Sequence, residues 1–246
     1  YSHTNLLKEG LQKRLGIFPL MKFWGPGADI SSSRWIADAS TIIMREQQPS
    51  LSLVYLPHLD YNLQRLGPTD PNIMNDISAV DAEAGKIIDS AKEQGADVVV
   101  LSEYAITAVD NPIHINRILR HHGFLQVRQE CTGWETLDGG ASRAFAVADH
   151  QIAHIYIRDS CDIPHLETLL RETKGIDQVL NRDMQKILGI DHERAGDLVV
   201  VAEQGCWFTY YYWLDDIRAP DYARTVDIHR KPGYDPAELF VDSKIR

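Results

Sequence analysis

The sequence has 246 residues, with 25 Lys and Arg against 35 Asp and Glu, which gives a formal net charge of −10. This acidic balance argues against nucleic-acid binding, because contacts with the phosphate backbone depend on clustered lysines and arginines. A hydrophobic content of 44% suits one large globular α/β domain, or one domain with a small insert. No apolar run approaches the ~18 residues of a membrane-spanning helix, so we expect no membrane segment.

Cysteine usage points to a reducing compartment. Cys131, Cys161 and Cys206 are widely spaced and odd in number, which suggests neither a disulfide framework nor a zinc site. The start of the sequence has no features of a signal peptide. We therefore expect a cytoplasmic protein.

The first fifty residues predict two helices. Periodicity indicates a short helix over residues 6–15 and another over about 34–45, with Ser32 or Ser33 as its cap. Between them, residues 18–26 are aromatic and broken by Pro and Gly, which favours a packed loop.

A short apolar run, Leu51 to Leu56, predicts a buried strand of a parallel sheet. His58 and Asp60 follow it, and an extended backbone would point both side chains to the same side. Ligands bind beyond the carboxyl ends of strands in open α/β sheets, so we expect a polar or metal-binding site here. In the alternative interpretation, Asp60 caps the next turn and His58 is a partly exposed loop residue.

The clearest amphipathic helix is predicted over residues 71–93, and Gly95 ends it. A second parallel strand is predicted over Asp97–Leu101. A strand, a helix and a second strand imply a right-handed βαβ unit, which would bring Asp60 and Glu103 to one edge of the sheet.

The second half predicts a mixture of helices and strands. We expect helices over 112–122, 164–172 and 179–188, strands over 124–129 and 196–202, and a β-hairpin over 143–157 with its turn near Asp149–His150. In such a hairpin His150 and His154 lie about 13 Å apart, so we expect structural histidines that bind no metal. The aromatic run 207–213 could stack bases or sugars, but core packing is favoured.

Three segments resemble the type I phosphodiesterase/nucleotide pyrophosphatase family of the alkaline phosphatase superfamily. In the first, Asp60 and Gly67–Pro68 match the family spacing, and Gln64 stands at a family His. In the second, residues 101–107, Glu103 stands at a family Asp and Tyr104 at a metal-binding His. In the third, residues 231–236, Pro232 replaces a His.

The resemblance implies an α/β fold, an alkaline-phosphatase-like sheet flanked by helices with a small β-hairpin insert. It implies that residues 1–246 form the C-terminal part of one such domain, with a cap or insert around 124–195. The family's Thr or Ser nucleophile and another metal-binding Asp belong to a first half, so we expect a fragment that lacks its N-terminal half. The uncovered sheet edge would favour self-association into a homo-oligomer.

The resemblance also implies a metal-dependent phosphohydrolase that cleaves phosphodiester or pyrophosphate bonds in a small phosphorylated or nucleotide-like substrate. The candidate ligands for divalent ions (Zn, Mn or Mg) are Asp60, His58, Glu103 and His229, with Asp227 beside His229. Gln64 and Tyr104 are candidate substrate-binding residues. Replacing imidazoles by these side chains shifts the ligand set towards oxygen, which suits Mg, Mn or Ca better than zinc.

Two other functions stay open. The metal site could be degraded, which would leave a non-catalytic binding or scaffold module on the same fold. The fold could also carry a different reaction, such as phosphoryl transfer or a mutase step.

Overall fold

The structure is a computed structural model that describes residues 5–25, 27–220 and 223. It is a mixed α/β protein whose chain divides into two compact units, Tyr1–Thr107 and Ala108–Arg246. Each unit is described by itself. Among the described residues, no helix combines the length and apolar character needed to cross a membrane.

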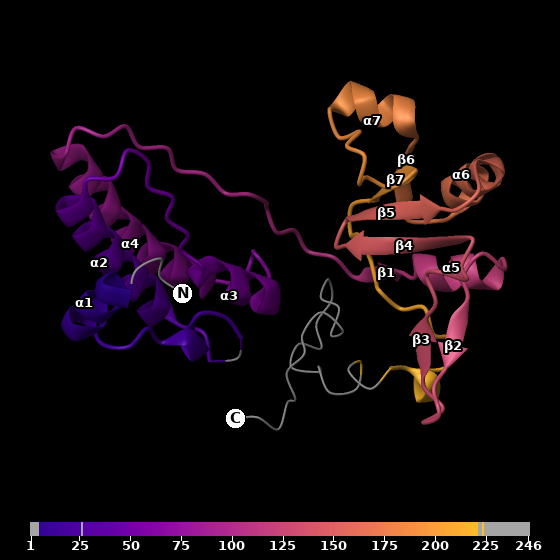
Figure 1. The fold of residues 1–246 in the computed structure, drawn as a ribbon, viewed down its shortest axis with the longest axis horizontal. Coiled ribbons are helices and arrows are strands. Elements are labelled where there is room, and N and C mark those ends of the chain that lie inside the picture. The colour runs from indigo at the N-terminus through magenta and orange to yellow at the C-terminus, as the bar shows by residue number, and fades with distance from the viewer. Residues whose placement is uncertain (1–4, 26, 221–222, 224–246) are drawn as a thin grey trace. The chain divides into compact units, whose positions relative to one another are not determined.

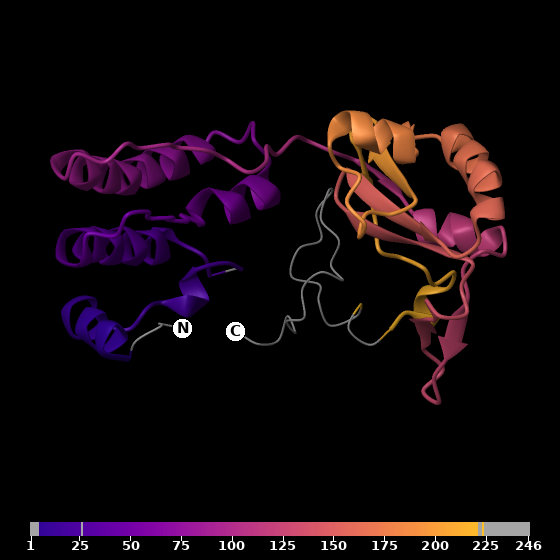
Figure 2. The ribbon, with the colours of Figure 1, turned by 45° about the horizontal axis from the view of Figure 1, so that its top comes forward.

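The described part of unit 1 is helical. Its elements are α1 (Asn5–Leu15), the 3-10 turn η1 (Leu20–Lys22), α2 (Ile30–Gln47), α3 (His58–Leu66) and α4 (Ile73–Glu93). In Figure 2, the indigo and purple helices of this unit lie in successive layers. Helices α2 and α4 pack along each other. An ion pair joins them, in which Nε of Arg34 on α2 lies 3.0 Å from Oε1 of Glu83 on α4. The predicted helices over 6–15, 34–45 and 71–93 are confirmed, although Asp29, rather than Ser32 or Ser33, caps α2.

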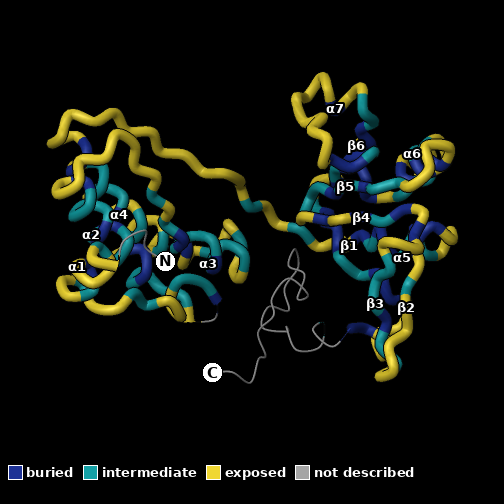
Figure 3. Tube along the Cα trace, viewed as in Figure 1, coloured by how far each residue is buried: buried dark blue, intermediate teal, exposed yellow. Residues whose placement is uncertain are grey.

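The two strands predicted in this unit are wrong. Residues 51–56 and 97–101 form neither strand nor helix, and no backbone hydrogen bond joins them to another described residue. They are also largely exposed, with Leu53 at 88% and Val99 at 83% (Figure 3). A strand needs a neighbour that supplies donors and acceptors, and the described residues provide none here.

Unit 2 combines short strands with short helices (Figure 1). Its elements are β1 (Asn111–Ile113), α5 (Ile115–His121), β2 (Val127–Gln129), β3 (Glu135–Leu137), β4 (Ala144–Asp149), β5 (Ile152–Ile157), η2 (Ser160–Asp162), α6 (Ile163–Glu172), β6 (Ile176–Leu180), α7 (Arg182–Leu188), β7 (Leu198–Ala202), β8 (Cys206–Phe208) and η3 (Asp216–Arg218).

An antiparallel sheet of order β4-β5-β7-β6 organises unit 2. Two smaller pairs accompany it: β1 with β8, which is parallel, and β2 with β3, which is antiparallel. Strand β4 alternates buried alanines with more exposed residues, as a strand with one face on a core does. Strand β7 lies between two partners, and its residues Leu198, Val199 and Val200 are fully buried. The core therefore sits around β7 and the inner face of β4 and β5.

Several predictions for this unit are confirmed. They are the hairpin over 143–157, the helix over 164–172 and the strand over 196–202. The helix predicted over 112–122 exists as the shorter α5, and the strand over 124–129 as the shorter β2. The helix predicted over 179–188 is partly wrong, because the chain is still in β6 until Leu180.

The aromatic run 207–213 packs in the core, as expected. Trp207, Phe208, Tyr212 and Trp213 are all buried. The segment with Asp227 and His229 lies outside the described residues.

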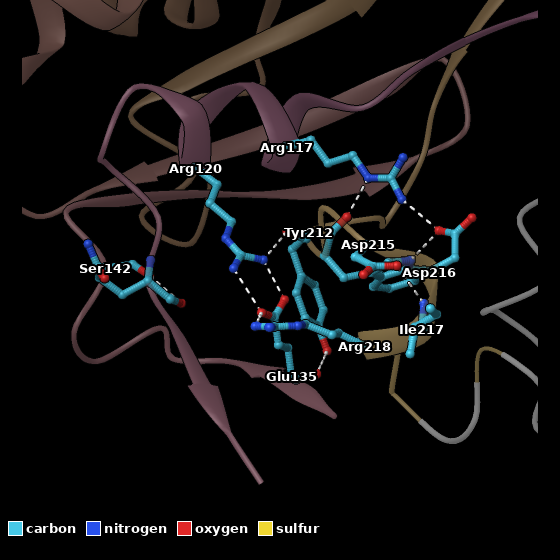
Figure 4. Close-up of polar contacts among 11 residues, drawn as sticks. Arg117, Arg120, Glu135, Ser142, Tyr212, Asp215, Asp216, Ile217 and Arg218 are labelled. Atoms are coloured by element: carbon cyan, nitrogen blue, oxygen red, sulfur yellow. Dashed lines mark hydrogen bonds and ion pairs between the residues drawn. The ribbon is translucent and has the colours of Figure 1, made fainter. Parts of the chain in front are cut away.

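A buried charge network fastens the chain after β8 to α5 and β3 (Figure 4). Glu135 has a side chain that is only 4% exposed, and Arg120 reaches its two oxygens at 2.5 and 3.0 Å. Arg218 approaches the same carboxylate at 3.6 Å. The Tyr212 hydroxyl donates to the backbone carbonyl of Glu135, and Arg120 donates to that of Tyr212. Side chains distant in sequence thus satisfy one another's buried polar groups.

The charge of Glu135 should contribute to stability. The hydrogen bond from Arg120 is the largest influence that lowers the pKa of Glu135 below its ordinary value, so folding favours the ionised form. That contribution is complete above the unfolded pKa of about 4.3 and is lost as pH falls through the lower folded pKa. We expect Glu135→Gln to lower the free energy of unfolding by about 3 kcal/mol at neutral pH, because it removes the charge that pairs with the largely buried Arg120.

Urea denaturation between about pH 3 and pH 7 measures this effect. The fall in stability towards acid should be smaller in Glu135→Gln than in the wild type. Glu172→Gln, at an exposed position, is the control and should follow the wild type. Identical acid dependence in Glu135→Gln and the wild type would contradict this role.

Gly196 marks a close approach of backbones before β7. A Cβ atom there would lie 2.7 Å from the backbone nitrogen of Ile155 and 2.8 Å from the carbonyl oxygens of Ile155 and Leu198. These neighbours are backbone atoms of the sheet and cannot move aside as a side-chain tip can. Only glycine fits this position without a shift of β5 or β7.

We expect Gly196→Ala to lower the free energy of unfolding by about 1–3 kcal/mol, the usual cost of overpacking. Gly139→Ala is the matched control, because its Cβ would meet the nearest atom, of Phe145, at an ordinary 3.6 Å. Thermal and urea denaturation of both variants measure the difference. Equal stability of the two variants would show that the sheet accommodates the extra carbon.

Candidate functional site

Asp60 and His58 lie in the first turn of α3, which begins directly after Pro57. The expectation that an extended backbone points both side chains to one side is therefore wrong. Residues two apart on a helix point in nearly opposite directions, since each residue turns the helix by about 100°. An acidic residue in a first turn also benefits from the positive end of the helix dipole, so helix formation favours Asp60 here.

The Asp60 carboxylate accepts hydrogen bonds from three side chains of unit 1. The indole nitrogen of Trp24 lies 2.6 Å from Oδ2, and the Tyr104 hydroxyl lies 2.5 Å from Oδ1. The Gln64 amide nitrogen, one helical turn on, is 3.0 Å from both oxygens. These contacts occupy all of the about four lone-pair positions of a carboxylate. The structure thus brings together the predicted site residues Asp60, Gln64 and Tyr104.

His58 is directed elsewhere, towards helix α4. Its Nε2 lies 3.2 Å from Oδ1 of Asp76, and the two side chains are only 7% and 17% exposed. The second oxygen of Asp76 accepts the side-chain amide of Asn62 at 2.8 Å. His58 and Asp60 are therefore not a ligand pair in this structure, and His58 joins α3 to α4.

The hydroxyls of Tyr55 and Tyr104 lie within the influence of two carboxylates, Asp60 and Glu103. Burial is the largest influence that raises the pKa of Tyr104, and the hydrogen bond to Asp60 raises it further. Burial also raises the pKa of Tyr55, followed by the charges of Asp60 and Glu103. Both phenols therefore stay protonated at neutral pH and act as donors. Neither is suited to be an ionised nucleophile.

The sequence interpretation missed three participants, Trp24, Tyr55 and Asp76. Trp24 lies in the aromatic stretch 18–26, which was interpreted only as a packed loop. A partly buried indole N–H normally requires a hydrogen-bond acceptor, so the tryptophan itself was the signal that an acceptor lies nearby. Nothing in the local sequence links Asp76 to His58, because the pair depends on how α3 and α4 pack.

The described residues do not form a centre for two divalent ions. Such a centre needs several carboxylates and imidazoles that converge at close range. Among the described residues, no group of three or more His, Cys, Asp and Glu side chains does so. Asp60 is fully engaged with protein donors, and Glu103 is the one exposed carboxylate of the predicted set in this region. His229 lies outside the described residues.

His150 and His154 occupy the hairpin of unit 2, as the sequence indicated. His150 is in the turn with a φ of 53°, and His154 lies in β5. The Nδ1 atom of His154 accepts the backbone N–H of Gly196 at 3.0 Å, which is a structural contact. That neither binds a metal stays a prediction.

Solved structures share the fold of this chain. A crystal structure of phosphonoacetate hydrolase from Sinorhizobium meliloti 1021 in complex with phosphonoformate aligns with a TM-score of 0.50 at 16% identity, over 78% of this chain and 45% of that chain. Murine ectonucleotide pyrophosphatase/phosphodiesterase 5 aligns with a TM-score of 0.49 at 17% identity, over 74% and 46%. The chain thus spans less than half the length of these structures. No curated protein shows significant similarity to the sequence.

The alignment with the phosphonoacetate hydrolase structure shows a shared α/β fold, and an α/β fold is what the sequence predicted. A family model described as type I phosphodiesterase/nucleotide pyrophosphatase matches residues 3–235, nearly the whole chain. That span includes Asp60, Gln64, Glu103 and Tyr104. The chain belongs to the type I phosphodiesterase/nucleotide pyrophosphatase family.

Proposed function

We propose that the protein cleaves phosphodiester or pyrophosphate bonds in a small phosphorylated, nucleotide-like substrate. The observation that carries this proposal is the family match over residues 3–235. The convergence of Asp60, Gln64 and Tyr104 supports it, because these residues come from two of the three segments that resemble the family.

Within this proposal Gln64 and Tyr104 lie on the substrate side of the site. Tyr104 is 49% exposed, and burial and Asp60 keep its hydroxyl protonated, so it can contact a substrate as a neutral group. Asp60 and Glu103 are anionic and would repel a phosphate, so a positive partner is needed close by. Divalent ions would supply such charge, and oxygen donors would favour Mg or Mn over Zn. The described residues do not themselves form a centre for these ions.

A second candidate function has its own supporting observation. Asp60 is saturated by protein donors, as in a polar cluster that maintains structure. On this basis the protein would be a binding or scaffold module on a hydrolase fold. We also propose a cytoplasmic location, since Cys131, Cys161 and Cys206 are free thiols in the structure.

The assay for the proposed activity uses the protein with any sequence that adjoins this chain, and a p-nitrophenyl ester of a nucleotide. We expect release of nitrophenol, and we expect Asp60→Asn to lower kcat/KM by about 100-fold, since a small misplacement of site residues has such effects. Asp81→Asn, at an exposed position on α4, is the control and should keep the wild-type rate. Binding of the ester without turnover would favour the binding module instead.

A separate prediction concerns the 246 residues alone. We expect no turnover of the same ester above the Asp60→Ala variant, with Mg, Mn or Zn added in turn. The reason is that no activated nucleophile lies beside Asp60 among the described residues, and loss of a nucleophile costs several orders of magnitude in rate. Turnover by the isolated chain that Asp60→Ala abolishes would show that this chain contains the nucleophile.

A further inference from the structure

We infer that Asp60 is a positioning residue whose carboxylate fastens the loop around Trp24 and the segment around Tyr104 to helix α3, and that it does so through protein donors in place of a metal ion. This inference stands apart from the proposed hydrolase activity, because it concerns the architecture of unit 1. It can hold or fail whether or not the protein cleaves a phosphoester.

The Asp60 carboxylate joins residues that are far apart in the sequence. Trp24 precedes Asp60 by 36 residues, and Tyr104 follows it by 44. Both contacts are short, at 2.6 and 2.5 Å, which is typical of hydrogen bonds to an ionised acceptor. Gln64, which lies one turn later on the same helix as Asp60, donates a further hydrogen bond to the carboxylate. A single side chain thus joins three separate parts of unit 1.

The segment around Tyr104 makes few other hydrogen bonds with the rest of its unit. No backbone hydrogen bond joins residues 97–107 to another described residue. Ser102 donates only to the carbonyl of Tyr104, two residues away, at 2.6 Å. The residues from 97 to 105 are all exposed. The hydroxyl of Tyr104 is therefore a main attachment of this segment to the helices of its unit.

The donors around Asp60 oppose the binding of a cation at its carboxylate. The indole nitrogen of Trp24 and the amide nitrogen of Gln64 both face the Asp60 carboxylate as donors, so neither of these two atoms can coordinate a cation. An ion at Asp60 would have to displace at least one of these donors and leave it without an acceptor. In a partly buried setting that loss opposes binding. His58, the nearest imidazole in sequence, is engaged with Asp76.

The experiment uses the 246-residue chain labelled with 5-fluorotryptophan. The chain has five tryptophans, and a Trp24→Phe variant assigns the resonance of Trp24. We expect Asp60→Asn to shift this ¹⁹F resonance, because an amide cannot accept from all three donors. Chymotrypsin should cleave within residues 97–107 on the order of tenfold faster in Asp60→Asn and in Tyr104→Phe, since each loses a charge-assisted hydrogen bond.

The control is Asp81→Asn, which removes the same charge from an exposed position of α4 and should leave both readouts unchanged. Calorimetric titration with Zn, Mn or Mg should show the same metal binding for the wild type and for Asp60→Asn. Stoichiometric binding that Asp60→Asn abolishes and Asp81→Asn keeps would overturn the inference. An unshifted Trp24 resonance with unchanged cleavage would do the same. If Asp60→Asn does not fold, the test rests on Tyr104→Phe, which keeps the ring and loses only the hydroxyl. Faster cleavage of this variant within residues 97–107 would support the inference, and an unchanged cleavage rate would overturn it.

Discussion

Hydrogen bonding of extended backbone decides which apolar segments of this chain become strands. Residues 198–202 (LVVVA) and 97–101 (DVVVL) have nearly the same composition. The first lies between β5 and β6, and its Val199 and Val200 are fully buried. The second has no backbone partner among the described residues, and its Val99 and Val100 are 83% and 74% exposed. Propensity alone does not make a strand, because the pleated backbone must also find donors and acceptors.

This contrast explains how much of the fold could be predicted from the sequence. Helix α4 could be predicted because its apolar periodicity is a local feature of the sequence. The hairpin of β4 and β5 could be predicted because alternation and a tight turn are local too. The runs 51–56 and 97–101 could not, since a periodicity argument assumes a neighbouring strand that the pattern does not itself contain. The cap of α2 at Asp29 was missed because four candidate residues lie within five positions.

The candidate site likewise combines features that the sequence predicted with features that depend on tertiary packing. The sequence predicted that Asp60 and the 103–104 segment meet, and the structure places the Tyr104 hydroxyl on the carboxylate. The predicted route, two adjacent strand ends, is not the observed one, because Asp60 lies in a helix. The roles of Trp24 and Asp76 depend on tertiary packing and had no local signature. The Asp60 carboxylate is thus surrounded by neutral hydrogen-bond donors.

The exposed valines of residues 98–101 have a consequence for how the chain behaves in solution. Four consecutive apolar residues of high β propensity, without proline, resemble the short segments that stack into cross-β assemblies. Asp97 precedes this run and Glu103 follows it, so like charges would be brought together whenever two copies stacked in parallel register. Charged residues that flank an unavoidable hydrophobic segment act as gatekeepers. The charges of Asp97 and Glu103 therefore oppose parallel stacking of this run, independently of any part that Glu103 takes in chemistry.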